Sequence, residues 1–131
     1  MDFITVIKAI AIWFGILLLA IMNGGLREAV LIPKLGLTPG LILSGLLLSV
    51  LILLITYLTL PWLNVQNTHH LIAIGLGWLI LTVVFEFSFG LLRGMPWSEI
   101  LDAYTFKDGN IWSLVLLVTA VAPWLAAWFR T

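Results

Sequence analysis

Long apolar segments without a charged residue dominate this sequence. One such run extends from Leu35 to Thr68 and a second from Gly109 to Phe129. An α-helix needs about 20 mostly apolar residues to cross the hydrocarbon core of a bilayer. Four segments satisfy this requirement, so we expect membrane-spanning helices at about 4–22, 41–63, 71–93 and 109–129. Tryptophans lie near the expected boundaries, as in an aromatic belt: Trp62, Trp97, Trp112, Trp124 and Trp128.

The composition excludes the common classes of water-soluble protein. Hydrophobic residues make up 63% of the 131 residues and charged residues only 9%, whereas soluble domains carry about 25% charged residues. A soluble fold of this size leaves too much surface exposed to hide so many apolar side chains. The formal net charge of zero provides no basic surface for nucleic acid. We therefore expect an all-α polytopic membrane protein that forms a single domain over residues 1–131.

The charged residues gather at one end of the expected bundle. Four spans place both termini and the 64–70 loop on one side, and loops 23–39 and 94–108 on the other. The first side carries Asp2, Lys8 and Arg130, and the second carries Arg27, Glu28, Lys34, Arg93, Glu99, Asp102, Lys107 and Asp108. Cytoplasmic loops carry an excess of Lys and Arg, so loops 23–39 and 94–108 are expected to be cytoplasmic.

Glu86 is the most informative polar residue because it lies inside the third expected span. An ionised carboxylate at a helix centre costs about 3 kcal/mol on insertion scales, so such residues usually face a bundle interior or a wet cavity. Steps of four residues place Trp78, Thr82 and Gly90 on the same helical stripe. Two interpretations stay open here. Glu86 is either a proton or cation site, or a structural group that forms an ion pair or a hydrogen bond to a neighbouring helix.

The segment Asn23-Gly24-Gly25-Leu26-Arg27-Glu28 follows the first expected span. Adjacent glycines each cost about 1 kcal/mol in a helix interior, so the helix is expected to end or break here. A break would expose backbone groups that can bind an ion or substrate. We favour a simple helix end at the membrane surface, where Gly and Asn are common.

Arg27 and Glu86 belong to the same half of the membrane, and a long Arg side chain can reach a buried acid. We therefore expect an Arg27–Glu86 ion pair, with Glu28 pointing elsewhere, toward Arg93 or the loop. The expected ion- or substrate-binding residues are Glu86, Arg27, Glu28, Asn23, Thr82 and Trp78.

Residues 95–104 have the pattern of a short amphipathic helix that lies on the membrane surface. Trp97, Ile100, Leu101 and Tyr104 follow i, i+3, i+4, i+7 spacing. An interfacial connector is the favoured interpretation. A lid over Glu86 or a docking surface is the functional alternative, and its candidate residues are Trp97, Asp102, Tyr104 and Arg93.

Neither a cofactor nor a metal site is expected. The chain has no cysteine, and the adjacent His69 and His70 lack the i, i+3 or i, i+4 spacing of helical metal ligands. No nucleophile–base pair, metal set or phosphate loop indicates an enzyme.

Three motifs carry a resemblance: Asn23-Gly24-x-x-Arg27-Glu28, Glu86-Phe87-x-Phe89-Gly90, and Trp97…Asp102-x-Tyr104…Gly109-x-x-Trp112. At these motifs the chain resembles an uncharacterised family of small four-helix bacterial inner-membrane proteins. The resemblance covers nearly the whole chain. The resemblance implies a fold and a location in the bacterial inner (plasma) membrane, but no activity. The chain is similar to small multidrug resistance transporters only in architecture. Their essential acid lies in the first helix, where this chain has Lys8 and no acid.

These observations predict transport or permeation of a small solute or ion, with Glu86 as the titratable group and Arg27 as its partner. A homo-oligomer in the lipid bilayer is expected, because four short helices enclose little polar volume and comparable small transporters build their pathway between subunits. The alternative function is an accessory or assembly subunit whose charged end docks a larger membrane complex.

Overall fold

The computed structural model describes residues 2–65, 67–102, 104–105 and 111–130. Within them every regular element is helical: α1 (Phe3–Leu26), the π-helix η1 (Arg27–Leu31), α2 (Ile32–Leu35), α3 (Leu37–Leu63), α4 (Thr68–Leu92), α5 (Trp97–Asp102) and α6 (Trp112–Arg130). Four helical segments are long and apolar enough to cross a membrane: Phe3–Leu35, Leu37–Leu63, Thr68–Leu92 and Trp112–Arg130. The all-α polytopic fold expected from the sequence is confirmed.

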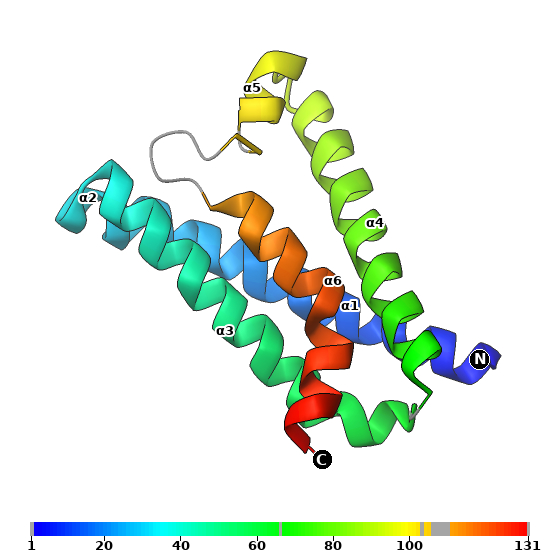
Figure 1. The fold of residues 1–131 in the computed structure, drawn as a ribbon. Coiled ribbons are helices and arrows are strands. Elements are labelled where there is room, and N and C mark those ends of the chain that lie inside the picture. The colour runs from blue at the N-terminus through cyan, green and yellow to red at the C-terminus, as the bar shows by residue number, and fades with distance from the viewer. Residues whose placement is uncertain (1, 66, 103, 106–110, 131) are drawn as a thin grey trace.

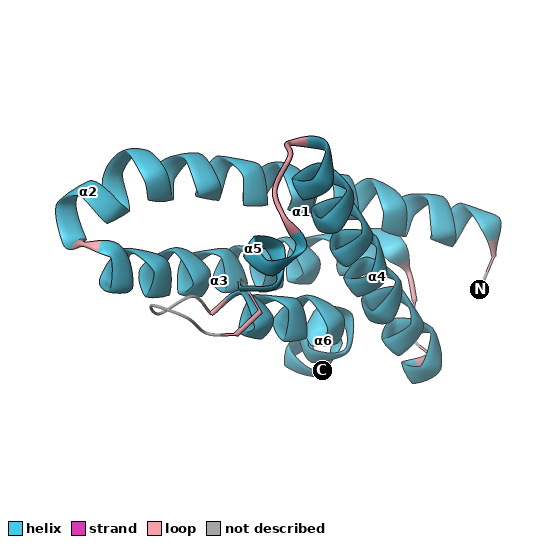
Figure 2. Ribbon diagram, turned by 90° about the horizontal axis from the view of Figure 1, so that it is seen from above, coloured by secondary structure: helices cyan, strands magenta, loops and turns pink. Residues whose placement is uncertain are grey.

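The helices are arranged so that α6 packs against both α3 and α4, while α1 packs mainly against α3. Helices α1 and α4 share a much shorter contact and diverge toward the end of the molecule that carries α2 and α5 (Figures 1 and 2). Both chain ends and the turn between α3 and α4 lie at the opposite end (Figure 1). This divergence opens the bundle at the end where the sequence concentrates its charges.

Glycines allow the closest approaches between helices. A Cβ on Gly75 of α4 would lie 1.8 Å from the carbonyl oxygen of Ala120 in α6, so the two backbones touch at this point. On α3, a Cβ on Gly40 would lie 3.0 Å from the Ile32 side chain. Small residues at such crossings let membrane helices pack backbone to backbone.

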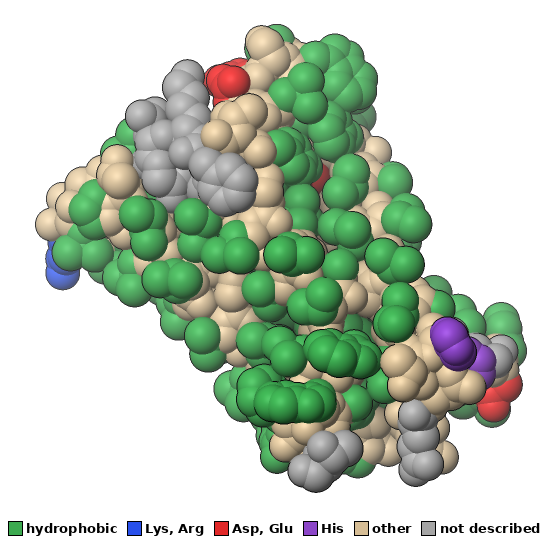
Figure 3. Space-filling view, in the orientation of Figure 1, with side chains coloured by type: hydrophobic (Ala, Val, Ile, Leu, Met, Phe, Trp, Pro, Cys, Tyr) green, Lys and Arg blue, Asp and Glu red, His purple; other side chains and the backbone are tan. Residues whose placement is uncertain are grey.

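The outer surface is apolar, as a lipid-facing surface requires. Large apolar side chains are exposed on all four long helices, including Phe14, Leu46, Ile80 and Leu117. In Figure 3 hydrophobic side chains cover most of the visible face, and the acidic, basic and histidine side chains lie near its ends. This distribution fits a protein that crosses the membrane several times.

The first span differs from both expectations for the Asn-Gly-Gly segment. The helical backbone runs through the glycines without a gap: α1 continues to Leu26, the π-helix η1 replaces the α-helical pattern from Arg27, and α2 extends the helix to Leu35. The Arg27 N–H bonds the carbonyls of Asn23 and Gly24, which carries the helix past the glycines. The chain finally turns at Gly36, whose φ of 94° lies in the region that favours glycine.

The other spans are close to the expected ranges. Helix α3 begins at Leu37 rather than at residue 41, α4 begins at Thr68, and α6 begins at Trp112. Residues 109 and 110 of the expected fourth span lie outside the described part of the chain. The short helix expected between the third and fourth spans is present as α5.

Candidate functional site

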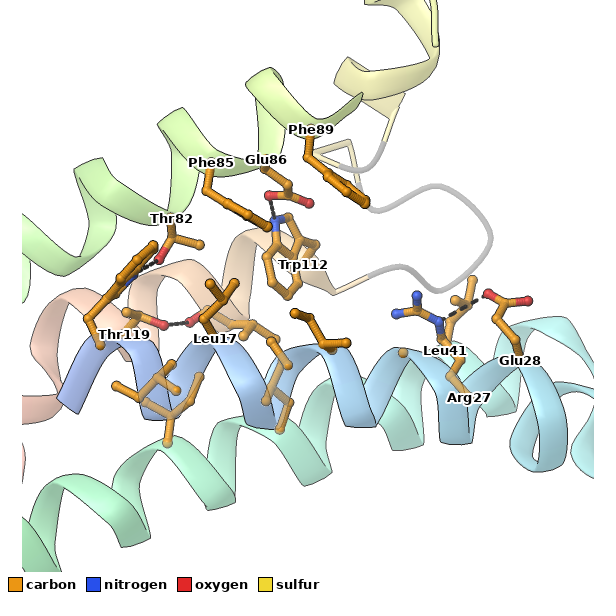
Figure 4. A pocket seen from close by; sticks show the side chains of 18 of the residues that line it. Leu17, Arg27, Glu28, Leu41, Thr82, Phe85, Glu86, Phe89, Trp112 and Thr119 are labelled. Atoms are coloured by element: carbon orange, nitrogen blue, oxygen red, sulfur yellow. Dashed lines mark hydrogen bonds and ion pairs between the residues drawn. The ribbon is translucent and has the colours of Figure 1, made fainter. Parts of the chain in front are cut away.

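A cavity of about 580 Å³ lies among the four long helices, on the side where α1 and α4 diverge. Its walls are mostly apolar and aromatic, and four of the described residues that line it are charged: Arg27, Glu28, Glu86 and Arg93. Pockets of this volume with a few convergent polar groups are typical binding sites. Figure 4 shows Glu86 on α4 across the cavity from Arg27.

The contact between α1 and α4 closes the cavity toward the middle of the bundle. Trp13 Nε1 donates a hydrogen bond to Thr82 Oγ1 at 3.0 Å, and both residues line the cavity. One turn earlier on α4, Trp78 Nε1 donates to the Ala9 carbonyl at 2.9 Å. These two indole bonds fasten α4 to the first half of α1.

Glu86 projects from α4 into this cavity and accepts two hydrogen bonds on one oxygen. Tyr104 Oη donates to Glu86 Oε2 at 2.9 Å, and Trp112 Nε1 donates to the same oxygen at 2.5 Å. The donors follow α5 and begin α6, so Glu86 connects three segments of the chain. Both donors are neutral, which leaves the carboxylate without a cation from either of them.

Tyr104 is positioned by ring contacts as well as by its hydroxyl. Its ring stacks on Phe87 with centroids 5.7 Å apart, and Phe87 also contacts Trp97 of α5 at 5.4 Å. Burial raises the pKa of Tyr104 above its usual value, and the charge of Glu86 and the hydrogen bond to it raise it further. Tyr104 therefore remains a protonated donor toward Glu86 at neutral pH.

The expected Arg27–Glu86 ion pair is wrong. Among the described residues, Arg27 Nε pairs with Glu28 Oε1 at 3.3 Å, so the expectation that Glu28 points elsewhere is wrong as well. Arg27 begins η1, where expectations based on α-helical geometry fail. Glu86 takes its hydrogen bonds from Tyr104 and Trp112 instead, and the Arg27 guanidinium lies on the facing wall (Figure 4).

Three other expected binding residues differ in whether they line the cavity. Thr82 lines the cavity. Trp78 is buried behind the cavity wall and is not among the lining residues. Asn23 is buried against α3, where Ser44 Oγ donates to its Oδ1 at 2.5 Å and its Nδ2 donates to the Ser44 carbonyl at 3.2 Å. Asn23 and Trp78 thus hold helices together rather than face the cavity.

Of the four expected lid residues, two lie at the cavity and two lie away from it. Tyr104 contacts Glu86, and Arg93 lines the cavity with its guanidinium 5.4 Å from the centre of the Phe89 ring. Trp97 and Asp102 are exposed and do not line the cavity. Of these four residues, Tyr104, which follows α5, is the one that bonds Glu86.

Sequence reasoning missed Trp112 as a partner of Glu86 and treated it as part of an aromatic belt. The available signal was its place at the start of the last span, at the same end of the bundle as Glu86. It also missed Trp13, Phe85 and Phe89, which line the cavity. Nothing in the apolar pattern distinguishes these side chains from lipid-facing ones.

No protein-family model, curated protein or solved structure matches the chain. Within the residues that the structure describes, no group of three or more His, Asp or Glu side chains is placed to hold a metal ion. The fold and the cavity define the class as a small all-α multi-pass membrane protein with a charged cavity among its helices. The resemblance to the small four-helix bacterial family stays a prediction.

Proposed function

We propose that this protein transports a small solute or ion, or lets it permeate, across the bacterial inner membrane. The cavity is the binding site, Glu86 is its titratable group, and Arg27 acts from the facing wall. The observation that carries the proposal is a carboxylate within a membrane-spanning helix that faces a cavity of about 580 Å³ and whose donors among the described residues, Tyr104 and Trp112, are both neutral. Acids in such positions are typical of ion pathways and proton relays.

The pathway has a closed half in this arrangement. The cavity extends from Arg27 and Arg93 to the bonded pair Trp13 and Thr82. Passage to the opposite side requires this contact between α1 and α4 to open, or a second copy to supply the remaining half. The second of these alternatives corresponds to the expected homo-oligomer.

An accessory or assembly role is the second candidate, and α5 is the observation that favours it. Trp97 and Leu101 are 57% and 49% exposed at the charged end of the molecule, beside the exposed Glu99. An exposed aromatic among charges is typical of a docking surface. In this role α5 binds a larger membrane complex, and Glu86 serves only to anchor Tyr104 and Trp112.

Labelling with a hydrophobic carbodiimide distinguishes the two functions, because such reagents attack protonated carboxyl groups in apolar surroundings. The protein in lipid is labelled across a pH series, and the modified residue is identified by mass spectrometry. Transport predicts pH-dependent modification of Glu86 and its disappearance in Glu86→Gln. Glu99→Gln, on the exposed surface of α5, is the matched control and leaves the labelling unchanged.

The accessory role predicts a different pattern. Glu86 resists labelling at every pH in the folded protein, and Glu86→Gln leaves co-purification of the partner from cells unchanged. Charge reversal at Glu99, Asp102 or Lys107 then abolishes co-purification of a partner. That result would exclude the transport proposal.

A further inference from the structure

The charges that line the cavity balance one another. Among the described residues, two with guanidinium groups, Arg27 and Arg93, and two with carboxylates, Glu28 and Glu86, line this cavity. A cationic ligand bound at Glu86 would lie in a cavity that also contains two cations, and an anionic ligand at Arg27 would meet two anions. Like charges placed together inside a site disfavour binding. The charge balance therefore disfavours ligands with a single charge.

The facing groups retain binding capacity toward the cavity. Among the described residues, Glu28 pairs with Arg27 at Nε, and a guanidinium has further donors on its terminal nitrogens that match an anionic group. The donors from Tyr104 and Trp112 both bind Oε2 of Glu86, and a carboxylate has further acceptor sites on its second oxygen. Figure 4 shows the two groups on opposite walls. A ligand that bears both an ammonium and an anionic group matches the charges of both walls.

Apart from Thr82 and Thr119, the rest of the cavity lining is mostly apolar and aromatic. Below the charged groups the walls come from α1, α3 and α4, with Ile16, Leu17, Leu48, Ile52 and Phe85. Burial of apolar ligand surface here is favourable. Figure 4 shows Arg27 and Glu28 at one end of the cavity and Thr82 at the other, with Glu86, Phe85 and Leu17 between them.

We propose that the cavity binds a zwitterionic amphiphile, with its ammonium at Glu86, its anionic group at Arg27 and its apolar body along α1 and α3. The proposal rests on the proposed function, because it names the ligand class of the same site. An apolar free amino acid and the headgroup of an ethanolamine phospholipid share this chemistry. Free solute and lipid are two sources of one ligand class.

Calorimetric titration of the protein in a nonionic detergent tests this directly. The probes are phenylalanine, its decarboxylated analogue phenethylamine, its deaminated analogue phenylpropionate, lysophosphatidylethanolamine and lysophosphatidylglycerol. We expect at least one zwitterion to bind about tenfold or more tightly than its singly charged counterparts, because each counterpart loses one charge-assisted contact. Binding of phenylalanine alone assigns a free amino acid, and binding of lysophosphatidylethanolamine alone assigns a lipid.

Substitutions locate the contacts. Glu86→Gln and Arg27→Gln are each expected to weaken binding of the zwitterion about tenfold or more. Glu99→Gln and Arg130→Gln, which change charges outside the cavity lining, leave the dissociation constant unchanged. Even where a variant fails to fold, the comparison among probes on the unaltered protein shows whether the cavity prefers a zwitterion to a singly charged ligand.

Three results would overturn the proposal. Phenethylamine binding as tightly as phenylalanine would make Glu86 a simple cation site, and the transport proposal would stand. Phenylpropionate binding as tightly as phenylalanine would make Arg27 an anion site. Absence of binding by all five probes would remove the zwitterion as ligand, while carbodiimide labelling of Glu86 would still decide the proposed function separately.

Discussion

At the residue scale, the surroundings of Glu86 explain how a carboxylate is accommodated inside a membrane span. Its donors are separated from it in sequence: Tyr104 follows α5, and Trp112 begins α6. A charge-assisted hydrogen bond is stronger than a neutral one. The carboxylate also lines a cavity that contains the charged residues Arg27 and Arg93. A single glutamate thereby joins α4 to the segment after α5 and to α6.

Tyr104 makes stability depend on pH in the alkaline range. The ordinary pKa of tyrosine is about 10, and burial, followed by the charge of Glu86, raises the pKa of Tyr104 in the folded protein. Above about pH 10 the unfolded chain loses a proton that the folded chain keeps, so the free energy of unfolding falls as pH rises. Tyr104→Phe should remove this part of the fall, measured by thermal unfolding in detergent from about pH 8 to about pH 11. Tyr57→Phe is the control. An equal fall in Tyr104→Phe and the unaltered protein would contradict the assignment.

Two buried serines on α3 make a matched pair. Ser44 Oγ donates to Asn23 Oδ1, whereas Ser49 Oγ is buried without a partner among the described residues. Ser44→Ala should lower the free energy of unfolding by about 1 kcal/mol, because it leaves the Asn23 oxygen without its donor. Ser49→Ala should be neutral or stabilising, since it removes an unsatisfied hydroxyl. Denaturant titrations of the two variants measure this, and equal losses would argue against a special role for Asn23.

At the element scale, close contacts between helices determine where the bundle is tight and where it opens. α4 meets α6 backbone to backbone at Gly75 and meets α1 through Trp78 and Thr82. Toward its C-terminal end α4 diverges from α1 (Figure 1). The cavity is the space left between helices that touch at one end and separate at the other.

Gly75 tests this arrangement, with Gly77 as a control on the same helix. A Cβ at Gly75 would lie 1.8 Å from the Ala120 oxygen, whereas a Cβ at Gly77 meets nothing within 4 Å. Gly75→Ala must separate α4 from α6 and should destabilise the protein by about 3 kcal/mol. Gly77→Ala should leave stability unchanged or raise it by up to about 1 kcal/mol, because alanine favours a helix more than glycine. Thermal unfolding in detergent compares them, and similar stabilities would refute the close approach.

At the scale of the whole molecule, four spans bring both termini to one end and α2 and α5 to the other (Figure 1). Arg27 at the start of η1 and Arg93 after α4, which line the cavity, lie toward the second end. The positive-inside rule favours a cytoplasmic position for that end, so the charged part of the cavity should lie on the cytoplasmic side.

The cysteine-free chain allows this orientation to be measured with single cysteines. Glu99→Cys on α5 and His69→Cys at the start of α4 introduce exposed thiols at opposite ends. A membrane-impermeant maleimide should label His69→Cys in cells whose inner membrane is accessible from outside. It should label Glu99→Cys only in inverted vesicles. The opposite pattern would reverse the orientation, and labelling of both variants in both preparations would mean dual insertion.

The properties of individual segments could be predicted from the sequence alone. The length and apolarity of the four spans, the absence of charges within the second and fourth, and the amphipathic spacing of residues 97–104 predicted the membrane class and α5, because transfer into lipid depends on a segment's own composition. The intramembrane position of Glu86 followed from the same pattern. The path of residues 23–35 did not, because glycine propensity was outweighed by hydrogen bonds of the helical backbone and by the Asn23–Ser44 contact.

Only the tertiary structure decided which side chains meet. Whether Glu86 reaches Arg27 or Trp112 depends on how far α1 and α4 diverge, and that depends on backbone contacts such as Gly75 against Ala120. Helix rotation and separation arise from packing between distant segments, which no local pattern encodes. The sequence by itself therefore determined a four-span membrane protein with an acid in its third helix. The crossing of its helices decided that this acid faces a cavity, bonds Tyr104 and Trp112, and lies opposite Arg27 rather than paired with it.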